Sequence, residues 1–132
     1  MSKNGLKVGK SAKTSHRVTQ EVVDAFGKVS GDYNPLHFDD VYARTTRFGR
    51  RIAHGTIVIG YLSGLMAATL PGPGTIYLEQ HTEFKAPVYI NDLVEVEVTV
   101  EEVKSNGIVR LSNKGMVGDR VVLQGYSIVL LS

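Results

Sequence analysis

One stretch of the chain carries no charged side chain at all: residues 55–70. As an α-helix with a rise of ~1.5 Å per residue it would extend about 24 Å. That length falls short of the roughly 30 Å hydrocarbon core of a bilayer. Residues 71–74, Pro-Gly-Pro-Gly, then end any helix. We therefore predict one long helix buried inside a protein, and no membrane span.

Most of the remaining chain has the two-residue period of β-strands. Residues 93–103 place four valines on one face and acidic or threonine side chains on the other, which is typical of an antiparallel sheet with one buried side. Residues 106–107, Asn-Gly, are a strong hairpin turn signal. Strands over 108–117 and 121–131 are expected to follow. The four valines are Val94, Val96, Val98 and Val100.

Residues 75–86 also alternate, which predicts a further strand. Three apolar side chains are expected on one of its faces (Ile76, Leu78 and Phe84) and three charged ones on the other (Glu79, Glu83 and Lys85).

The N-terminal third reads as helical. Residues 1–17 form a polar lead-in or an edge strand, and Thr19 is a suitable N-cap for a helix over 20–29 that Gly31 would end. A short helix is expected over 39–47.

These segments together predict an α+β fold in a single domain of residues 1–132. The antiparallel sheet has one apolar face that must be covered, and only the segment 55–70 is apolar enough to cover it. We therefore expect the antiparallel β-sheet to wrap around a long central apolar helix.

Composition excludes several classes of function. The formal net charge of +2 is too small to indicate a nucleic-acid partner. The absence of cysteine excludes disulfides, thiolate metal sites and cysteine nucleophiles. The first residues hold no apolar run, so no signal peptide is visible and a cytoplasmic location is expected.

The chemistry concentrates in residues 30–37, Ser-Gly-Asp-Tyr-Asn-Pro-Leu-His. Asp32 supplies a carboxylate and His37 an imidazole, while Gly31 and Pro35 are expected to keep this segment out of regular helix. A carboxylate and an imidazole on one rigid loop can move protons to and from water near neutral pH.

Gly55 opens the long apolar helix, directly after His54. Backbone N–H groups at a helix N-terminus have no partner within the helix and attract negative charge. A developing oxyanion could be held there, and glycine leaves room for a substrate to approach the backbone. His54 itself we interpret as a residue of the N-terminal turn.

Three motifs carry a resemblance to a known family. They are Gly-Asp-Tyr-Asn-Pro-Leu-His at 31–37, Phe-Gly…Ile-Ala-His-Gly at 48–55, and Phe-Lys-Ala-Pro-Val at 84–88. With them, residues 18–130 resemble the hot dog fold and, more narrowly, the MaoC-like (R)-specific enoyl-CoA hydratases. The family usually continues to a Gly-Asp pair. Here the pair is Asn91-Asp92, a mild departure because Asn tolerates left-handed geometry.

The resemblance implies reversible syn hydration of trans-2-enoyl-CoA to (R)-3-hydroxyacyl-CoA, in a homodimer. By motif position it makes Asp32 and His37 the catalytic pair and places the thioester oxygen at Gly55. Neither a metal nor a cofactor is expected, since coenzyme A belongs to the substrate. An Asp and a His alone also make a poor zinc site.

An acyl-CoA needs an apolar pocket and cations for its phosphates. Arginines at 44, 47, 50 and 51 cluster before the apolar helix. The residues expected to bind substrate are Tyr33, Asn34, Ser63, Arg50, Arg51 and Lys85, with Leu36 and Phe84 as further candidates for lining the pocket.

Three alternatives stay open from sequence. The same chemistry could act on a 3-hydroxyacyl group bound to acyl-carrier protein, the fold could host an acyl-CoA thioesterase, or the chain could be a non-catalytic acyl-CoA-binding subunit. Acyl chain length, pathway, oligomeric state beyond the dimer and the residue that protonates the α-carbon are also open.

Overall fold

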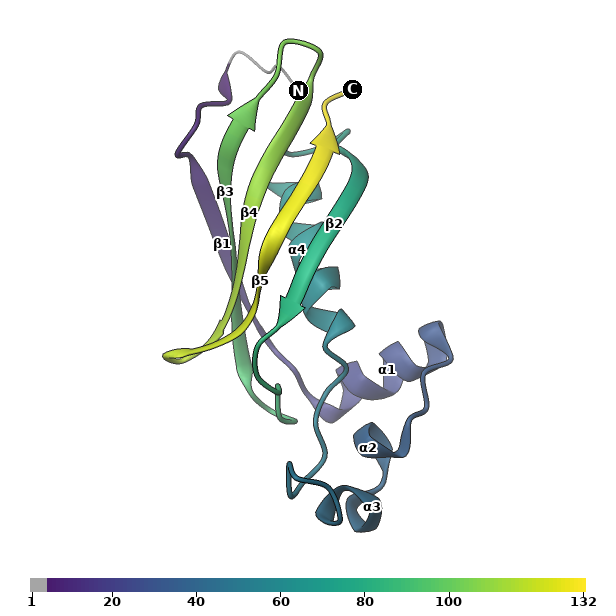
Figure 1. Cartoon of the computed structure of the whole chain (residues 1–132). Helices are drawn as coiled ribbons and strands as arrows, with labels where there is room; N and C mark the ends of the chain where they lie inside the picture. Colours follow the sequence, from purple (N-terminus) through teal and green to yellow (C-terminus); the bar gives the residue numbers. More distant parts are fainter. Residues whose placement is uncertain (1–4) are drawn as a thin grey trace.

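The computed structural model describes residues 5–132 and contains a five-stranded antiparallel sheet in the order β1-β3-β4-β5-β2. A long helix lies against one face of this sheet, and three shorter helices lie beyond one end of it (Figure 1). The predicted edge strand is β1, whereas residues 1–4 of the predicted lead-in lie outside the described residues. The strands are β1 (Ser11–Arg17), β2 (Ile76–Phe84), β3 (Leu93–Val103), β4 (Ile108–Val117) and β5 (Arg120–Leu130).

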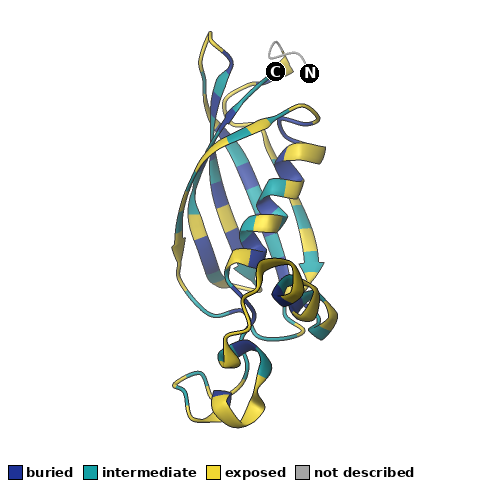
Figure 2. Cartoon of the chain, turned by 90° about the vertical axis from the view of Figure 1, so that its right-hand side faces the viewer, coloured by how far each residue is buried: buried dark blue, intermediate teal, exposed yellow. Residues whose placement is uncertain are grey.

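The central helix is α4 (Thr56–Ala68), as the uncharged stretch predicts. It crosses the sheet over β1 and β3, and buried residues recur along it between exposed ones (Figure 2). An antiparallel sheet around a central apolar helix is the hot dog fold, so the predicted fold class is confirmed. Among the described residues no helix is long and apolar enough to cross a membrane. The buried side chains of α4 are Ile57, Val58, Leu62, Leu65 and Met66.

The predicted alternation of β3 is confirmed. The side chains of Val94, Val96 and Val98 are fully buried and Val100 is 1% exposed. They face α4 together with apolar side chains from β4 and β5, such as Leu111. This layer between helix and sheet is the core that fixes the orientation of α4.

The faces of β2 differ from the prediction. Its pairing with β5 contains a bulge between Tyr77 and Glu79, so the alternation changes phase at Leu78. Ile76 and Phe84 therefore lie on opposite faces rather than on one. Both side chains, and that of Leu78, are about half exposed.

The first helix, α1 (Gln20–Ser30), begins and ends as predicted. The Thr19 hydroxyl accepts a hydrogen bond from the Val22 N–H, and Gly31 takes a left-handed conformation with φ of 77°. The short helix α3 (Asp40–Arg44) begins after the cap Asp39.

A further helix, α2 (Pro35–Phe38), corrects the prediction for the segment after Gly31. Proline is tolerated in the first turn of a helix because that N–H has no helical partner, so Pro35 begins α2 instead of preventing it. The Asn34 side chain accepts a hydrogen bond from the Leu36 N–H and caps the turn. His37 consequently lies on a helical turn, which fixes the direction of its ring.

Candidate active site

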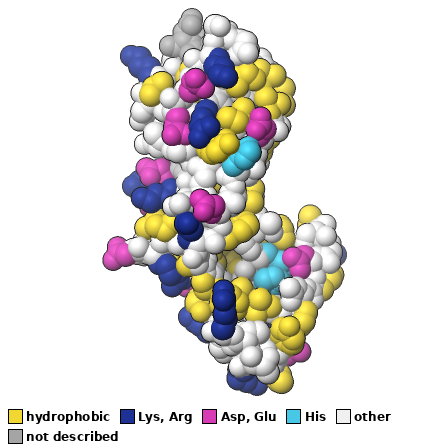
Figure 3. Space-filling view, viewed as in Figure 1, with side chains coloured by type: hydrophobic (Ala, Val, Ile, Leu, Met, Phe, Trp, Pro, Cys, Tyr) yellow, Lys and Arg dark blue, Asp and Glu magenta, His cyan; other side chains and the backbone are white. Residues whose placement is uncertain are grey.

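A cavity of about 370 Å³ lies where the end of β2, the N-terminus of α4 and the segment around α2 meet. On the outer surface, histidine and acidic side chains lie together beside apolar ones in the lower half of the molecule (Figure 3). The cavity is lined by Asp32, His37, Arg47, Phe48, Ile52, Ala53, His54, Gly55, Thr56, Val58, Phe84, Lys85, Ala86, Pro87, Val88 and Val122.

Asp32 is held by the turn that follows α1. One carboxylate oxygen, Oδ1, accepts a hydrogen bond from the Asn34 N–H at 3.2 Å, and the Asp32 N–H donates to the Ser30 hydroxyl at 3.1 Å. The residue is exposed and reaches the cavity. Its second carboxylate oxygen has no partner among the described residues, so it is available to a water molecule or a substrate.

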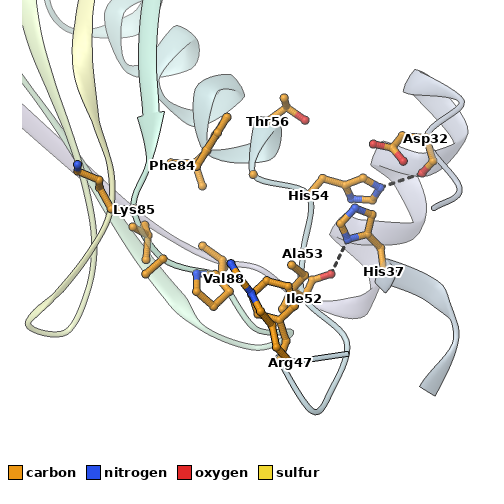
Figure 4. Close-up of a pocket in the computed structure, with 16 residues that line it drawn as sticks. Asp32, His37, Arg47, Ile52, Ala53, His54, Thr56, Phe84, Lys85 and Val88 are labelled. Atoms are coloured by element: carbon orange, nitrogen blue, oxygen red, sulfur yellow. Dashed lines mark hydrogen bonds between the residues drawn. The ribbon is translucent and has the colours of Figure 1, made fainter. Parts of the chain in front are cut away.

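His37 is fixed by a hydrogen bond to the segment that leads into α4. Its Nδ1 lies 2.7 Å from the Ile52 carbonyl oxygen, which can only accept, so Nδ1 carries the proton (Figure 4). In the neutral ring Nε2 then holds a lone pair. No protein group in the described part of the chain bonds to that Nε2, and His37 can therefore accept a proton there.

Burial lowers the pKa of His37 below its ordinary value of 6.5, because the charged ring is poorly solvated. The hydrogen bond to Ile52 opposes this shift, the neighbouring His54 adds to it, and the Asp32 carboxylate opposes it. The result favours a neutral His37 at pH 7, with a lone pair available on Nε2.

His54 is a third polar member of the site. It is only 2% exposed, and its Nε2 lies 2.9 Å from the Asp32 carbonyl oxygen. Its ring centroid lies 4.0 Å from that of His37, with the two planes 35° apart. The sequence predicts His54 only as a residue of the N-terminal turn of the helix, because nothing local in the sequence indicates its burial or its reach to Asp32.

The N-terminus of α4 opens on the same cavity. Gly55 takes the N-cap position without a side-chain cap, and among residues 5–132 the N–H groups of Gly55 and Thr56 have no acceptor. A Cβ at Gly55 would lie 2.9 Å from the Phe84 ring. Glycine therefore allows Phe84 to lie against the helix terminus and leaves two N–H groups available for an anion.

The structure brings together four of the residues predicted for the site. Asp32, His37, Gly55 and Lys85 all line the cavity. Arg47, which sequence analysis named only as part of an arginine cluster, also lines it. Phe84, which the sequence suggests for the acyl pocket, also lines the cavity. Apolar side chains from α4 and β5, which no sequence pattern indicates for the site, line it as well.

Five other predicted substrate-binding residues do not line the cavity. The Tyr33 ring packs on Phe38 at 5.4 Å and is otherwise exposed, and Asn34 caps α2. Arg50 lies over the Tyr89 ring at 3.8 Å, and Arg51 is bonded to Asp40 at 2.8 Å. Ser63 lies on α4 beyond the cavity, half-buried.

Comparison with known proteins identifies the family. The family model described as the MaoC like domain matches residues 3–121. The chain belongs to the MaoC-like domain family.

Relatives of this MaoC-like chain cover most of its length. It is 40% identical over 125 residues to the 3-hydroxybutyryl-CoA dehydratase of Methylorubrum extorquens, with 94% of this chain and 80% of that protein covered. It is 43% identical over 106 residues to the (R)-specific enoyl-CoA hydratase of Aeromonas caviae, with 80% and 79% covered. The solved structure of the A. caviae (R)-hydratase involved in PHA biosynthesis matches with a TM-score of 0.92 and 39% identity, covering 96% of this chain and 98% of that one.

The MaoC-like site also holds a set of groups able to bind a metal ion. One ligand atom each from Asp32, His37 and His54 lies within 4.8 Å of the others. Asp32 and His37 alone make a poor zinc site on sequence grounds, but His54 adds a third ligand atom, a second imidazole nitrogen. That no metal is needed stays a prediction, tested below.

We expect an NMR titration to give His37 a pKa below 6.5 and the Nδ1–H tautomer in the folded MaoC-like domain. Because the pKa is lower in the folded than in the unfolded chain, the unfolded chain binds more protons between the two values. The contribution of His37 to stability is therefore complete above pH 6.5 and is lost as the pH falls through the folded pKa. Long-range ¹H–¹⁵N spectra measure both quantities. A pKa of 6.5 or higher, or a protonated Nε2 in the neutral ring, would contradict this assignment.

Proposed function

We propose that this chain is an (R)-specific enoyl-CoA hydratase, a hydro-lyase that reversibly adds water to trans-2-enoyl-CoA to give (R)-3-hydroxyacyl-CoA. One observation carries the proposal. A carboxylate, an imidazole nitrogen and two helix N-terminal N–H groups open on one largely apolar cavity, and within residues 5–132 that nitrogen and those N–H groups have no hydrogen-bond partner. The named activities of the most similar relatives support the same reaction.

The helix terminus supplies the electrostatic part of the mechanism. Attack of water on C3 moves an electron pair through the conjugated system onto the thioester oxygen. The N–H groups of Gly55 and Thr56 can donate to that oxygen as its charge develops, and such donors are typically worth about 3–4 kcal/mol of barrier each. Phe84 and Val58 offer an apolar wall for the acyl chain.

Asp32 and His37 supply the proton transfers. A water molecule between the free Asp32 carboxylate oxygen and the His37 Nε2 would lose its proton to one of them as its oxygen bonds to C3. A proton then returns to C2, the α-carbon, to complete the hydrated product. Because both groups lie on one side of the cavity, delivery of oxygen and proton to the same face gives syn addition.

Two cations at the cavity suit the phosphates of coenzyme A. Arg47 and Lys85 both line the cavity, and among residues 5–132 the one ion pair of Lys85 is with the exposed Glu83 at 3.2 Å. A guanidinium and an ammonium can each bind a phosphate by charge-assisted hydrogen bonds. No cofactor beyond the coenzyme A of the substrate is required by this mechanism, and a cytoplasmic location stays a prediction.

The test is loss of the enoyl-thioester absorbance when purified protein is added to crotonyl-CoA, before and after treatment with EDTA. We expect rapid loss that EDTA does not change, giving a product oxidised by an (R)-specific 3-hydroxyacyl-CoA dehydrogenase. Loss with only the acyl-carrier-protein substrate would favour the dehydratase, and thiol release from a saturated acyl-CoA would favour a thioesterase. Binding of crotonyl-CoA without turnover would leave a non-catalytic acyl-CoA-binding subunit.

We propose further that the enzyme is a homodimer formed through α4 and β2. The exposed side of α4 carries no charge, and a Cβ built on Gly60 or Gly64 meets nothing within 4 Å. β2 is an edge strand of the sheet with Ile76 and Leu78 about half exposed. An uncharged helix surface and an apolar sheet edge are each the kind of surface that a second copy buries.

Light scattering is expected to give the wild-type protein about twice the 14.4 kDa mass of the chain. Gly60→Arg should give a monomer, because it adds a charge to the exposed uncharged side of α4 at a position where a Cβ meets no described atom within 4 Å. Val29→Arg adds the same charge at an exposed position on α1 and should leave the dimer intact. A wild-type monomer at micromolar concentration would refute the dimer, and a dimeric Gly60→Arg would refute this interface.

A further inference from the structure

We propose that His54 is a positioning residue that fixes the catalytic pair relative to the oxyanion-binding N–H groups. It is the residue directly before Gly55, and its side chain holds the backbone of Asp32. The inference rests on the proposed hydratase function and adds to it a residue outside the Asp–His pair.

Three hydrogen bonds join the two segments that carry the site. The His37 Nδ1–H donates to the Ile52 carbonyl at 2.7 Å, and the Ile52 N–H donates to the Leu36 carbonyl at 3.3 Å. The His54 Nε2–H donates to the Asp32 carbonyl at 2.9 Å. The first two bonds hold the segment of residues 32–37 near its C-terminal end, at Leu36 and His37. Of the three, only the bond from His54 holds that segment at its other end, at Asp32. Without it, the carboxylate would be held only by the turn of its own loop.

The tautomer of His54 follows from that bond. The Asp32 carbonyl oxygen can only accept, so the Nε2 of His54 carries the proton (Figure 4). The other ring nitrogen, Nδ1, is buried and has no partner among the described residues. A buried nitrogen without a partner costs free energy, and the hydrogen bond from the Nε2–H to the Asp32 carbonyl is the polar interaction of the ring that offsets this cost.

Packing alone does not require a histidine at this position. The His54 ring contacts the Phe26 ring at 4.8 Å and the Phe38 ring at 5.6 Å, in addition to the His37 ring at 4.0 Å. A phenyl ring could make these contacts without leaving a buried nitrogen unpaired. The feature that only the imidazole supplies is therefore the hydrogen bond to Asp32.

Displacement of a catalytic group by about 1 Å can cost on the order of 100-fold in rate. Loss of the His54 donor should therefore lower kcat, while the apolar cavity that binds the acyl chain, and with it KM, stays nearly unchanged. If His54 had only a packing role, replacing it would instead change the melting temperature. The kcat of a variant would then not depend on whether the new side chain has a hydrogen-bond donor.

The test compares His54→Gln with His54→Met, two side chains of similar length and volume. Gln keeps an N–H donor near the position of Nε2, and Met has none. We expect kcat for crotonyl-CoA hydration to be at least ~10-fold lower in His54→Met than in His54→Gln, with KM within about threefold. Equal kcat values in two folded variants would overturn the proposal. If His54→Met does not fold, His54→Phe keeps the ring without the donor, and wild-type kcat in that variant would overturn it equally.

A second readout separates this inference from the hydratase proposal. In ¹H–¹⁵N spectra, His54→Met should shift the backbone amides of residues 32–34, and His54→Gln should shift them much less. This comparison holds whether or not crotonyl-CoA is a substrate. Absence of hydration with the expected amide shifts would refute the proposed function alone, whereas equal amide shifts in the two variants would refute the positioning role.

Discussion

Asp32→Asn is expected to lower the turnover of crotonyl-CoA by at least ~100-fold while leaving the fold intact. The amide is nearly the same size as the carboxylate but is not a base. Its Oδ1 can still accept the hydrogen bond from the Asn34 N–H that holds the turn. Because the residue is exposed, the substitution leaves no buried group without a partner. The loss should therefore fall on kcat and not on the melting temperature.

The matched control for this variant is Asp39→Asn. Asp39 caps α3 by accepting hydrogen bonds from the N–H groups of Val41 and Tyr42, and Asn is an equally good cap. It lies outside the cavity lining, so kcat and KM should remain those of the wild type. Near-normal turnover in a folded Asp32→Asn protein would mean that Asp32 is not the base, and His37 alone would have to accept the proton of water.

The features that sequence could predict depend on local patterns. Four valines at alternate positions of β3 identify its buried face, because the strand has no bulge at those residues. Thr19 and Gly31 mark the ends of α1 through backbone and side-chain preferences that need no tertiary contact. Asn91, at a position where the resemblance implies a glycine, has a φ of 77°, the left-handed conformation that Asn tolerates.

The features that sequence missed depend on distant partners. The faces of β2 change at Leu78 because of its register with β5, which follows more than forty positions later in the chain. Arg50 and Arg51 carry the charge expected at a phosphate site, but Tyr89 and Asp40 engage them instead.

The candidate active site likewise combines residues that a local pattern predicts with a residue that only a distant contact places there. Asp32 and His37 could be paired from one short motif, since both belong to the segment 31–37. His54 belongs with them only because folding brings the start of α4 against that loop, and its hydrogen bond to Asp32 spans 22 positions. The burial that lowers the pKa of His37 has the same origin. Sequence motifs thus indicate the groups proposed to react, whereas their orientation comes from the packing of α2 against the segment before α4.

That packing depends in turn on the core, so the second large effect is expected at Val96→Asp. Val96 is fully buried at the centre of β3, between β1 and β4, on the face that α4 covers. Burying an ionised carboxylate without a partner costs several kcal/mol, and the lost valine contacts add to this. A domain of this size is typically stable by only about 5–15 kcal/mol, so we expect a chain that is mostly unfolded or insoluble at 25 °C.

Thr99→Asp is the control, because it adds the same carboxylate to the same strand on the opposite, partly exposed face. There the charge stays hydrated, and the nearest like charges, Glu97 and Glu101, should lower the free energy of unfolding by no more than about 1 kcal/mol. Circular dichroism with thermal melting measures both variants. Comparing the two variants shows whether the loss of stability comes from burial of the carboxylate or from its charge alone. If Val96→Asp melted at the same temperature as Thr99→Asp, the valine face of β3 would not lie under α4. The packing of α4 on these valines could then not be what orients the helix terminus at Gly55.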